Sequence, residues 1–155
     1  MNAIIFSSGH GKVITLLART LRWLESIPYA LLAIPLRLAL ATVFWNSAMA
    51  KLASWDTAVA LFTDEYRVPL LPPELAAYMA VSIELTAPIL LVLGLATRPT
   101  AAVLLGMTTV IEVFVYPQAW PTHLQWAAML LVLLARGPGK ISLDEMIRRR
   151  VLGPS

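Results

Sequence analysis

The sequence predicts an all-α integral membrane protein: a bundle of four transmembrane helices, with both termini in the cytoplasm and amphipathic helices at the membrane interface. Hydrophobic residues make up 59% of its 155 residues and charged residues only 14%, whereas soluble domains are about half apolar and a quarter charged. The chain contains four apolar stretches, each close to the roughly 20 residues that cross a bilayer as a helix. Most Lys and Arg residues flank these stretches on one side, as in multi-pass membrane proteins.

Residues 1–27 are predicted to form a short tail and an amphipathic helix that lies in the membrane interface. From Gly11 to Ser26, apolar residues recur at helical spacing opposite basic and polar ones. Trp23 is a suitable interfacial anchor for such a helix. The segment lacks the long apolar core and the small-residue cleavage site of a signal peptide, so we expect it to be retained.

The membrane domain is predicted at residues 28–136, with spans at about 28–49, 73–95, 100–116 and 120–136. Ser54 is expected to cap a second amphipathic helix that lies along the outer interface after the first span. Pro73 suits the first turn of the second span, where a missing N–H does no harm. Residues 97–99 are expected to form a tight inner loop, and residues 117–121 a turn before the last span.

Residues 137–155 are predicted to form a basic cytoplasmic tail. Within it, Ser142 followed by Glu145 has the spacing of a capping box at the start of a short helix. Of the Lys and Arg residues, three precede the first span, one lies in the inner loop and five follow the last span, against two on the other side. Basic residues favour the cytoplasmic side, so both termini are assigned to the cytoplasm.

Each predicted span carries one ionisable residue: Arg37, Glu84, Glu112 and His123 in chain order. Counting about 1.5 Å per residue places all four at about 14 to 18 Å from the cytoplasmic side, in one layer. A charge at this depth costs several kcal/mol unless it is paired or hydrated, so these side chains should point into the bundle. An ion pair between Arg37 and Glu84 is predicted, with guanidinium donors left over for Glu112 or for a ligand carbonyl.

This polar layer has two interpretations. Ionisable clusters inside a membrane usually mark ligand or proton pathways, but buried polar groups also fix the register of packed helices. His123 lies close enough to the outer interface to be a hydrated capping residue instead of a ligand or proton shuttle. Glu84, Glu112 and His123 could supply carboxylate and imidazole metal ligands, although their spacing matches no recognised metal motif.

The composition excludes several other chemistries. The absence of cysteine removes disulfides, thiolate metal sites and iron–sulfur clusters. With a single histidine inside the spans, a bis-histidine haem is not expected. The basic residues surround apolar spans and do not form an aromatic-interleaved basic face, so nucleic acid is not an expected partner.

Three sequence segments resemble the DoxX family. They are Arg37-Leu-Ala-Leu-Ala with Phe44 and Lys51-Leu52 after it, the stretch ELTAPILLVLGLATR, and the ending ARGPGKISLD. The resemblance extends over residues 34–150, and the segment VYPQAWPTHLQWA looks like a bacterial subgroup described as DoxX-type or DoxD-like.

The resemblance implies a four-helix protein of the bacterial inner membrane that is associated with redox chemistry. Such proteins include quinone-reducing thiosulfate oxidoreductases, and other relatives occur beside small secreted peptides linked to copper handling. The family's membrane Arg and Glu correspond here to Arg37 and Glu84. No complete cofactor motif is implied, so the cofactor is left open, with a quinone as one candidate.

The function predicted is that of a redox-system subunit with a quinone-like carrier in a polar intramembrane pocket. Arg37 would hold a carbonyl oxygen, and Glu84 would orient Arg37 or move a proton as the second catalytic residue. Glu112 and His123 would connect the pocket to the outer surface. The alternatives are a non-enzymatic partner or transport accessory in copper or metallopeptide handling, and a structural membrane anchor. Membrane lipids and either a protein partner or a second copy of the chain are the expected partners.

Overall fold

The computed structural model describes residues 8–153, with side chains from residue 13 onward. Residues 1–7, which are part of the predicted tail at residues 1–10, and residues 154–155 lie outside this part. Its helices are α1 (Ser8–Glu25), α2 (Tyr29–Ala53), α3 (Trp55–Leu61), the π-helix η1 (Phe62–Tyr66), α4 (Pro73–Leu93), α5 (Thr97–Val110), the π-helix η2 (Ile111–Val115), the 3₁₀-helix η3 (Pro117–Ala119), α6 (Trp120–Arg136) and α7 (Leu143–Leu152).

The all-α prediction is confirmed for the described residues, which contain no strand. Three helical segments in this part of the chain are long and apolar enough to cross a membrane: Tyr29–Ala53, Pro73–Leu93 and Thr97–Val115. Helix α6 coincides with the predicted fourth span, but with 17 residues it is shorter than these three segments. The fourth crossing and the orientation of the termini therefore remain predictions.

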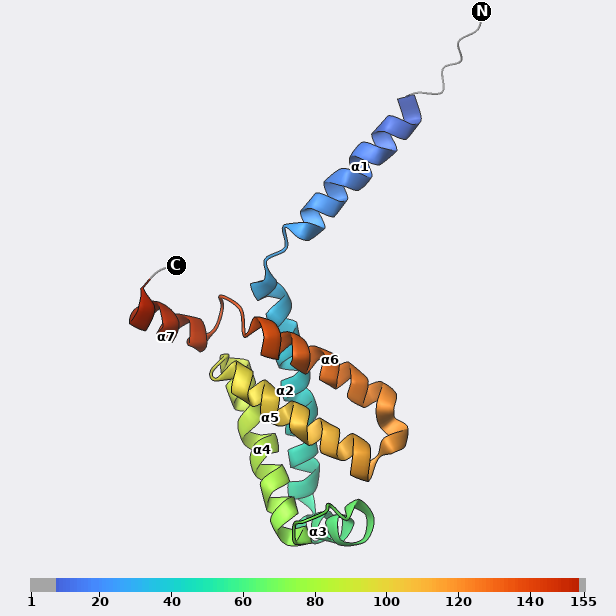
Figure 1. Ribbon diagram of the computed structural model, residues 1–155, viewed down its shortest axis with the longest axis vertical. Coiled ribbons are helices and arrows are strands. Elements are labelled where there is room, and N and C mark those ends of the chain that lie inside the picture. Colours follow the sequence, from blue (N-terminus) through green and yellow to red (C-terminus); the bar gives the residue numbers. More distant parts are fainter. Residues whose placement is uncertain (1–7, 154–155) are drawn as a thin grey trace, which may run out of the picture.

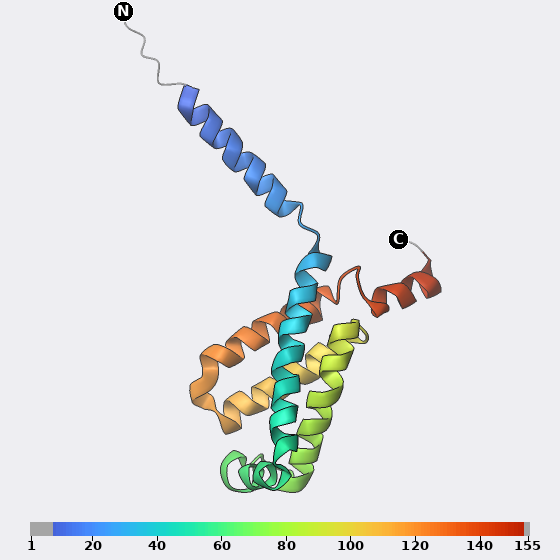
Figure 2. The ribbon, with the colours of Figure 1, turned by 180° about the vertical axis from the view of Figure 1, so that it is seen from behind.

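The helices form two packed pairs. Helices α2 and α4 lie side by side, and α5 and α6 form a second hairpin that crosses the first (Figures 1 and 2). Helix α3 lies across one end of the bundle, while α7 and the start of α2 lie at the other (Figure 1). We call these the α3 end and the α7 end.

Small residues bring the first helix pair close together. Ala33 and Ala48 of α2 and Ala77 of α4 are fully buried, and such residues let helix backbones approach closely in a membrane. A core of larger side chains joins the two pairs; it contains Leu40, Phe44, Leu91, Leu104, Leu130 and Leu133. Large apolar side chains are also exposed around the bundle, which is the distribution expected of a protein surrounded by lipid.

Helix α1 projects away from the bundle in both views (Figures 1 and 2). It begins at Ser8, three residues before the predicted start. Its apolar residues Val13, Leu17 and Leu21 are 57 to 58% exposed. The other residues that the structure describes do not cover this apolar face, as expected of a helix that lies in an interface.

Most predicted helix boundaries are close to those observed. Ser54 occupies the N-cap position of α3, although its hydroxyl contacts the Thr57 hydroxyl at 2.7 Å and makes no backbone capping bond. Pro73 is the first residue of α4. The Ser142 hydroxyl accepts a hydrogen bond from the Glu145 N–H at 3.2 Å, which confirms the predicted N-cap of α7.

The predicted inner loop at residues 97–99 is wrong, because these residues form the first turn of α5. The chain instead reverses over residues 94–96, where Gly94 and Ala96 have φ of 64° and 49°. The Asp144 carboxylate accepts the N–H groups of Ala96 and Thr97 at 2.7 and 2.9 Å, and thereby caps α5 from a distant part of the chain. With this external cap the helix begins three residues earlier than local sequence signals suggest.

Candidate functional site

A mostly apolar cavity of about 600 Å³ lies between the two helix pairs. Its apolar wall includes Phe44, Phe62 and Trp126. Polar side chains reach it from several helices: Ser47 and Lys51 on α2, Tyr66 on η1, Glu84 on α4, Tyr116 after η2 and His123 on α6. An aromatic-walled cavity with a few polar groups is the usual form of a small-molecule site.

Glu84 is the central acid of this cavity and is only 2% exposed. Both of its carboxylate oxygens accept hydrogen bonds from the Lys51 ammonium, at 2.9 and 3.0 Å. The Ser47 hydroxyl donates to the same carboxylate at 2.9 Å and accepts from Lys51 at 2.8 Å. Glu84 is thus held by an ammonium and a hydroxyl from the neighbouring helix, so its charge is fully compensated.

The predicted ion pair between Arg37 and Glu84 is wrong. Helical side chains lean toward the N-terminus of their own helix. Because α2 and α4 run antiparallel, Arg37 leans toward the α7 end while Glu84 leans toward the α3 end, so the two diverge. Lys51, which lies 14 residues after Arg37 on α2, leans inward from the α3 end and therefore meets Glu84.

Within residues 8–153, the hydrogen bonds of the Arg37 side chain all go to backbone carbonyls. Its guanidinium donates to Leu91 and Val92 at 2.7 and 2.6 Å, and to Ile141 and Pro138 at 2.9 and 3.2 Å. The first two carbonyls belong to the last turn of α4, where helical hydrogen bonding runs out, and the Leu91 carbonyl also accepts the Gly94 N–H at 3.1 Å. Arg37 therefore closes the end of α4 and ties the segment before α7 to it.

The region around Arg37 also joins two of the sequence segments that resemble the DoxX family, the LGLATR stretch and the ARGPGKISLD ending. Gly94 of the LGLATR stretch adopts φ of 64°, and a Cβ added there would lie 2.6 Å from the Ser142 Cβ and 3.0 Å from the Arg37 Cζ. The Asp144 N–H also donates to the Gly94 carbonyl at 3.0 Å. These segments thus form one packed structure around Arg37, which accounts for their residue types without any ligand.

His123 and Glu112 form the second polar pair of the cavity. The His123 Nδ1 lies 2.6 Å from a Glu112 carboxylate oxygen. His123 lines the cavity and packs against Trp126, with ring centroids 5.1 Å apart. The Glu112 side chain is 31% exposed, so the pair extends from the cavity wall to the surface of the bundle, while its predicted connection to the outer membrane face stays a prediction.

Two tyrosines lie at the α3 end of the cavity. The Tyr66 and Tyr116 hydroxyls are 3.3 Å apart, and their rings meet edge to face. The Tyr116 hydroxyl donates this hydrogen bond and the Tyr66 oxygen accepts it, so Tyr66 keeps its own O–H as a donor toward the cavity.

The predicted layer of four residues is thus divided between two regions. Glu84 and His123 reach the cavity, Glu112 is attached to it through His123, and Arg37 belongs to the α7 end. Within residues 8–153, no group of three or more His, Cys, Asp or Glu residues is placed to hold a metal ion. The three residues considered as metal ligands do not converge, because the Glu84 carboxylate is bound to Lys51.

Lys51 and Ser47 were not predicted as site residues. Lys51 was counted as a marker of the end of the first span, because a lysine at that position is usual. One signal was available in the sequence. Ser47 and Lys51 are four residues apart and continue the buried stripe of Leu40 and Phe44 on α2, so both face the bundle.

Comparisons with known proteins agree with this fold. The DoxX family model matches residues 31–117. An uncharacterized protein from Haemophilus influenzae is 30% identical over 129 residues, which cover 74% of this chain and 82% of the relative. No solved structure matches the chain significantly. The family match covers more than half of the chain and includes Lys51, Glu84 and Glu112, and the chain therefore belongs to the DoxX family.

Proposed function

We propose that this protein is a multi-pass subunit of a redox system in the bacterial inner membrane, and that it binds a quinone-like carrier in the 600 Å³ cavity. The observation that carries the proposal is the cavity itself, which is apolar and aromatic but is reached by buried or half-buried protonatable side chains from three helices. Its volume lies within the roughly 300 to 1,000 Å³ of typical ligand sites. DoxX membership is consistent with a membrane protein linked to redox chemistry.

The side chains match what a quinone head group requires. Reduction of a quinone to the quinol adds two electrons to the ring and one proton to each of its two carbonyl oxygens. Lys51 and His123 would bind these oxygens, and their partners Glu84 and Glu112 would replace the protons that are delivered. Lys51 thereby takes the carbonyl-binding role predicted for Arg37. The electrons would come from a redox partner protein, as the chain has no cysteine to supply them.

The cavity also offers a lateral route for a lipid-soluble ligand. On α5 the lining residues Val103, Gly106 and Val110 are themselves exposed on the outside of the bundle. Gly106 leaves open space, because a Cβ added there would meet nothing within 4 Å. A carrier dissolved in the bilayer would enter past this face of α5 without crossing water.

The direct test is to purify the protein in mild detergent, extract the bound lipids and quantify quinones by mass spectrometry. A Gly106→Phe variant should fill the entrance while all polar groups remain, and should lose the quinone. Val132→Phe is the matched control, because it adds the same ring to an exposed position on α6 that does not line the cavity. Equal quinone content in the two variants, or none in the wild type, would refute the proposal.

The same sample tests the alternative function in copper or metallopeptide handling. That function would use the carboxylate and imidazole of Glu112 and His123, with further ligands from a partner. Metal analysis of the wild type and of His123→Ala distinguishes the two. Stoichiometric copper, zinc or iron that is lost in His123→Ala, without bound quinone, would favour the alternative.

We also propose four crossings with both termini in the cytoplasm, as the distribution of Lys and Arg indicates. At 1.5 Å per residue the 17 residues of α6 span about 26 Å, slightly less than a typical bilayer core of about 30 Å. A reporter fused after Ser155 should therefore be cytoplasmic, and a tag near Thr63 should be periplasmic. A periplasmic reporter at the C-terminus would mean that α6 does not cross.

A further inference from the structure

We propose that a second cavity, at the α7 end, binds the phosphate group of an anionic phospholipid. This cavity has a volume of about 730 Å³ and lies where α2 begins, α5 begins and α6 ends. Its basic lining residues are Arg98, Arg136, Lys140 and Arg148, and its acidic ones are Asp144 and Glu145. The inference concerns a site separate from the proposed quinone cavity and does not depend on it.

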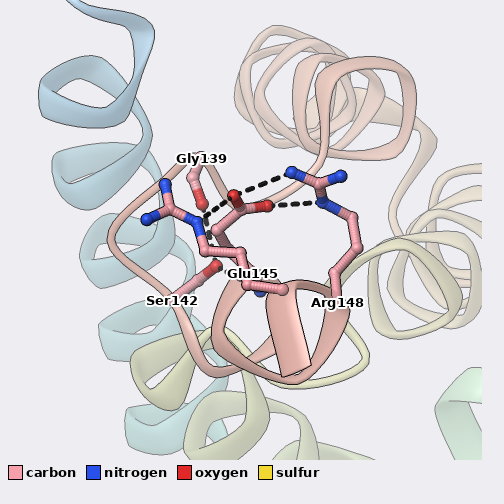
Figure 3. A network of polar contacts seen from close by, with 5 residues as sticks. Gly139, Ser142, Glu145 and Arg148 are labelled. Atoms are coloured by element: carbon pink, nitrogen blue, oxygen red, sulfur yellow. Dashed lines mark hydrogen bonds and ion pairs between the residues drawn. The ribbon is translucent and has the colours of Figure 1, made fainter. Parts of the chain in front are cut away.

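Both acids are already used within the protein. The Asp144 carboxylate accepts the N–H groups that cap α5. The Glu145 carboxylate accepts from Arg148 at 2.7 and 2.9 Å and from Arg149 at 2.7 Å, so it lies between two guanidinium groups (Figure 3). Asp144 keeps its negative charge, but the lining still has four basic side chains against two acidic ones, and neither carboxylate forms an ion pair with Arg98, Arg136 or Lys140 among the described residues.

Three basic side chains therefore give the cavity a net positive charge. Among the residues that the structure describes, Arg98, Arg136 and Lys140 form no ion pair with a carboxylate. Arg98 donates one hydrogen bond, to the Ala135 carbonyl at 3.2 Å, and Arg136 lies over the Tyr29 ring with 5.8 Å to its centroid. A guanidinium has five N–H donors, so each keeps several for a phosphate oxygen.

The backbone around these residues is held firmly in place. The Tyr29 hydroxyl donates to the Gly137 carbonyl at 2.8 Å. A Cβ added at Gly139 would lie 2.9 Å from the Ala30 Cα, so this loop packs directly against α2. The basic residues on either side of the loop therefore start from fixed positions, which reduces the entropy lost when an anion binds.

The surroundings favour a lipid phosphate over a soluble one. Helix α7, which carries Arg148, also exposes Ile147, Val151 and Leu152 at 51, 74 and 75%. A short helix with basic and apolar faces lies at a membrane interface. The cavity is also at the ends of the apolar helices α2 and α6, where lipid head groups would be found. Clusters of Lys and Arg in this position attract anionic lipids.

The test is titration of the full-length protein in an uncharged detergent with phosphatidylglycerol, observed by native mass spectrometry. Phosphatidylglycerol should bind, and phosphatidylcholine, which has no net charge, should bind at least tenfold more weakly. Lys140→Gln and Arg136→Gln should each weaken phosphatidylglycerol binding about fivefold. Arg150→Gln removes an exposed charge outside the cavity and should leave binding unchanged.

Two further measurements keep the result decisive. Lys140 makes no ion pair with the described residues, so Lys140→Gln should unfold at the wild-type temperature, and its binding defect then reports on the site. Inorganic phosphate and glycerol 3-phosphate are titrated in parallel to represent a soluble ligand. Binding of either as tight as that of phosphatidylglycerol would overturn the lipid assignment. An equal effect of Arg150→Gln, or equal binding of the two lipids, would overturn the site.

Discussion

Helix α2 carries two inward-facing basic residues, the buried Arg37 and the half-buried Lys51, which the structure uses in different ways. Arg37 is 6% exposed and donates only to backbone carbonyls of α4 and of the segment before α7. Lys51, about 21 Å further along the helix, bonds only to the side chains of Ser47 and Glu84, on the wall of a cavity. Burial of a charge in a membrane helix therefore does not identify a functional residue, whereas the nature of its partners does.

The difference has a chemical consequence. Arg37 donates to four backbone carbonyls at once, so a ligand that displaced the guanidinium would remove all four hydrogen bonds. In the Lys51–Glu84 pair, the carboxylate and the ammonium can instead exchange a proton. The ammonium can also donate to a ligand oxygen, and neither event requires the backbone to change. We therefore assign a structural role to Arg37 and ligand chemistry to the Lys51–Glu84 pair.

The largest effect is expected for Arg37→Leu. This change removes the donor for four carbonyls and should lower the free energy of unfolding by about 5 kcal/mol. Thermal unfolding in detergent should show the loss, and trypsin should cut at Lys140 more rapidly. Arg37→Lys should recover only part of the stability, because an ammonium cannot reproduce the planar fork of donors. A stable Arg37→Leu protein that fails to bind quinone would mean that Arg37 binds the ligand and is not a structural residue.

Changes to the Lys51–Glu84 pair should have a smaller effect on stability and a larger one on ligand binding. Glu84→Leu leaves a buried ammonium without its carboxylate and should cost about 3 kcal/mol. The double variant Lys51→Met with Glu84→Leu removes both charges and should recover most of that stability. Its bound quinone should nevertheless be lost. A stable double variant with wild-type quinone content would show that this pair is as structural as Arg37.

The sequence predicted the helices better than it predicted their partners. The bounds of α6 are marked by nearby prolines and a glycine, and the Ser142 cap is marked by its spacing to Glu145. Each of these signals lies within one short segment of the sequence. The partner of Glu84 depends on the register of α2 against α4 and on which way each side chain leans. A depth count of about 1.5 Å per residue gives similar depths for Arg37 and Glu84 but not their opposite directions. The cap of α5 by Asp144 likewise depends on tertiary packing that no local pattern reveals.

A pair of glycine substitutions compares the two regions at the backbone level. Gly94→Ala forces a residue with a Cβ into φ of 64° and places that Cβ 2.6 Å from Ser142, so stability should fall by about 1 to 2 kcal/mol. Gly106→Ala, beside the cavity, meets nothing within 4 Å and should gain up to about 1 kcal/mol from its helix propensity. Thermal unfolding of the two variants measures both effects. Equal destabilisation would mean that the cavity face is packed as tightly as the α7 end.

The smallest effect concerns an ion pair at the surface, which differs from both buried sites. Hydrogen bonds from Arg148 and Arg149 lower the pKa of Glu145 to about 2, against an ordinary 4.5. The unfolded chain then binds more protons between these values, so the pair contributes stability that is complete above pH 4.5 and disappears as the pH falls through 2. The contribution should be slight, because water screens an exposed pair. An NMR titration of the Glu145 carboxyl carbon should show the low pKa, and Arg148→Gln should raise it. A pKa near 4.5 in the wild type would mean that Glu145 is not held by these arginines, which would leave a carboxylate available to neutralise the cavity at the α7 end.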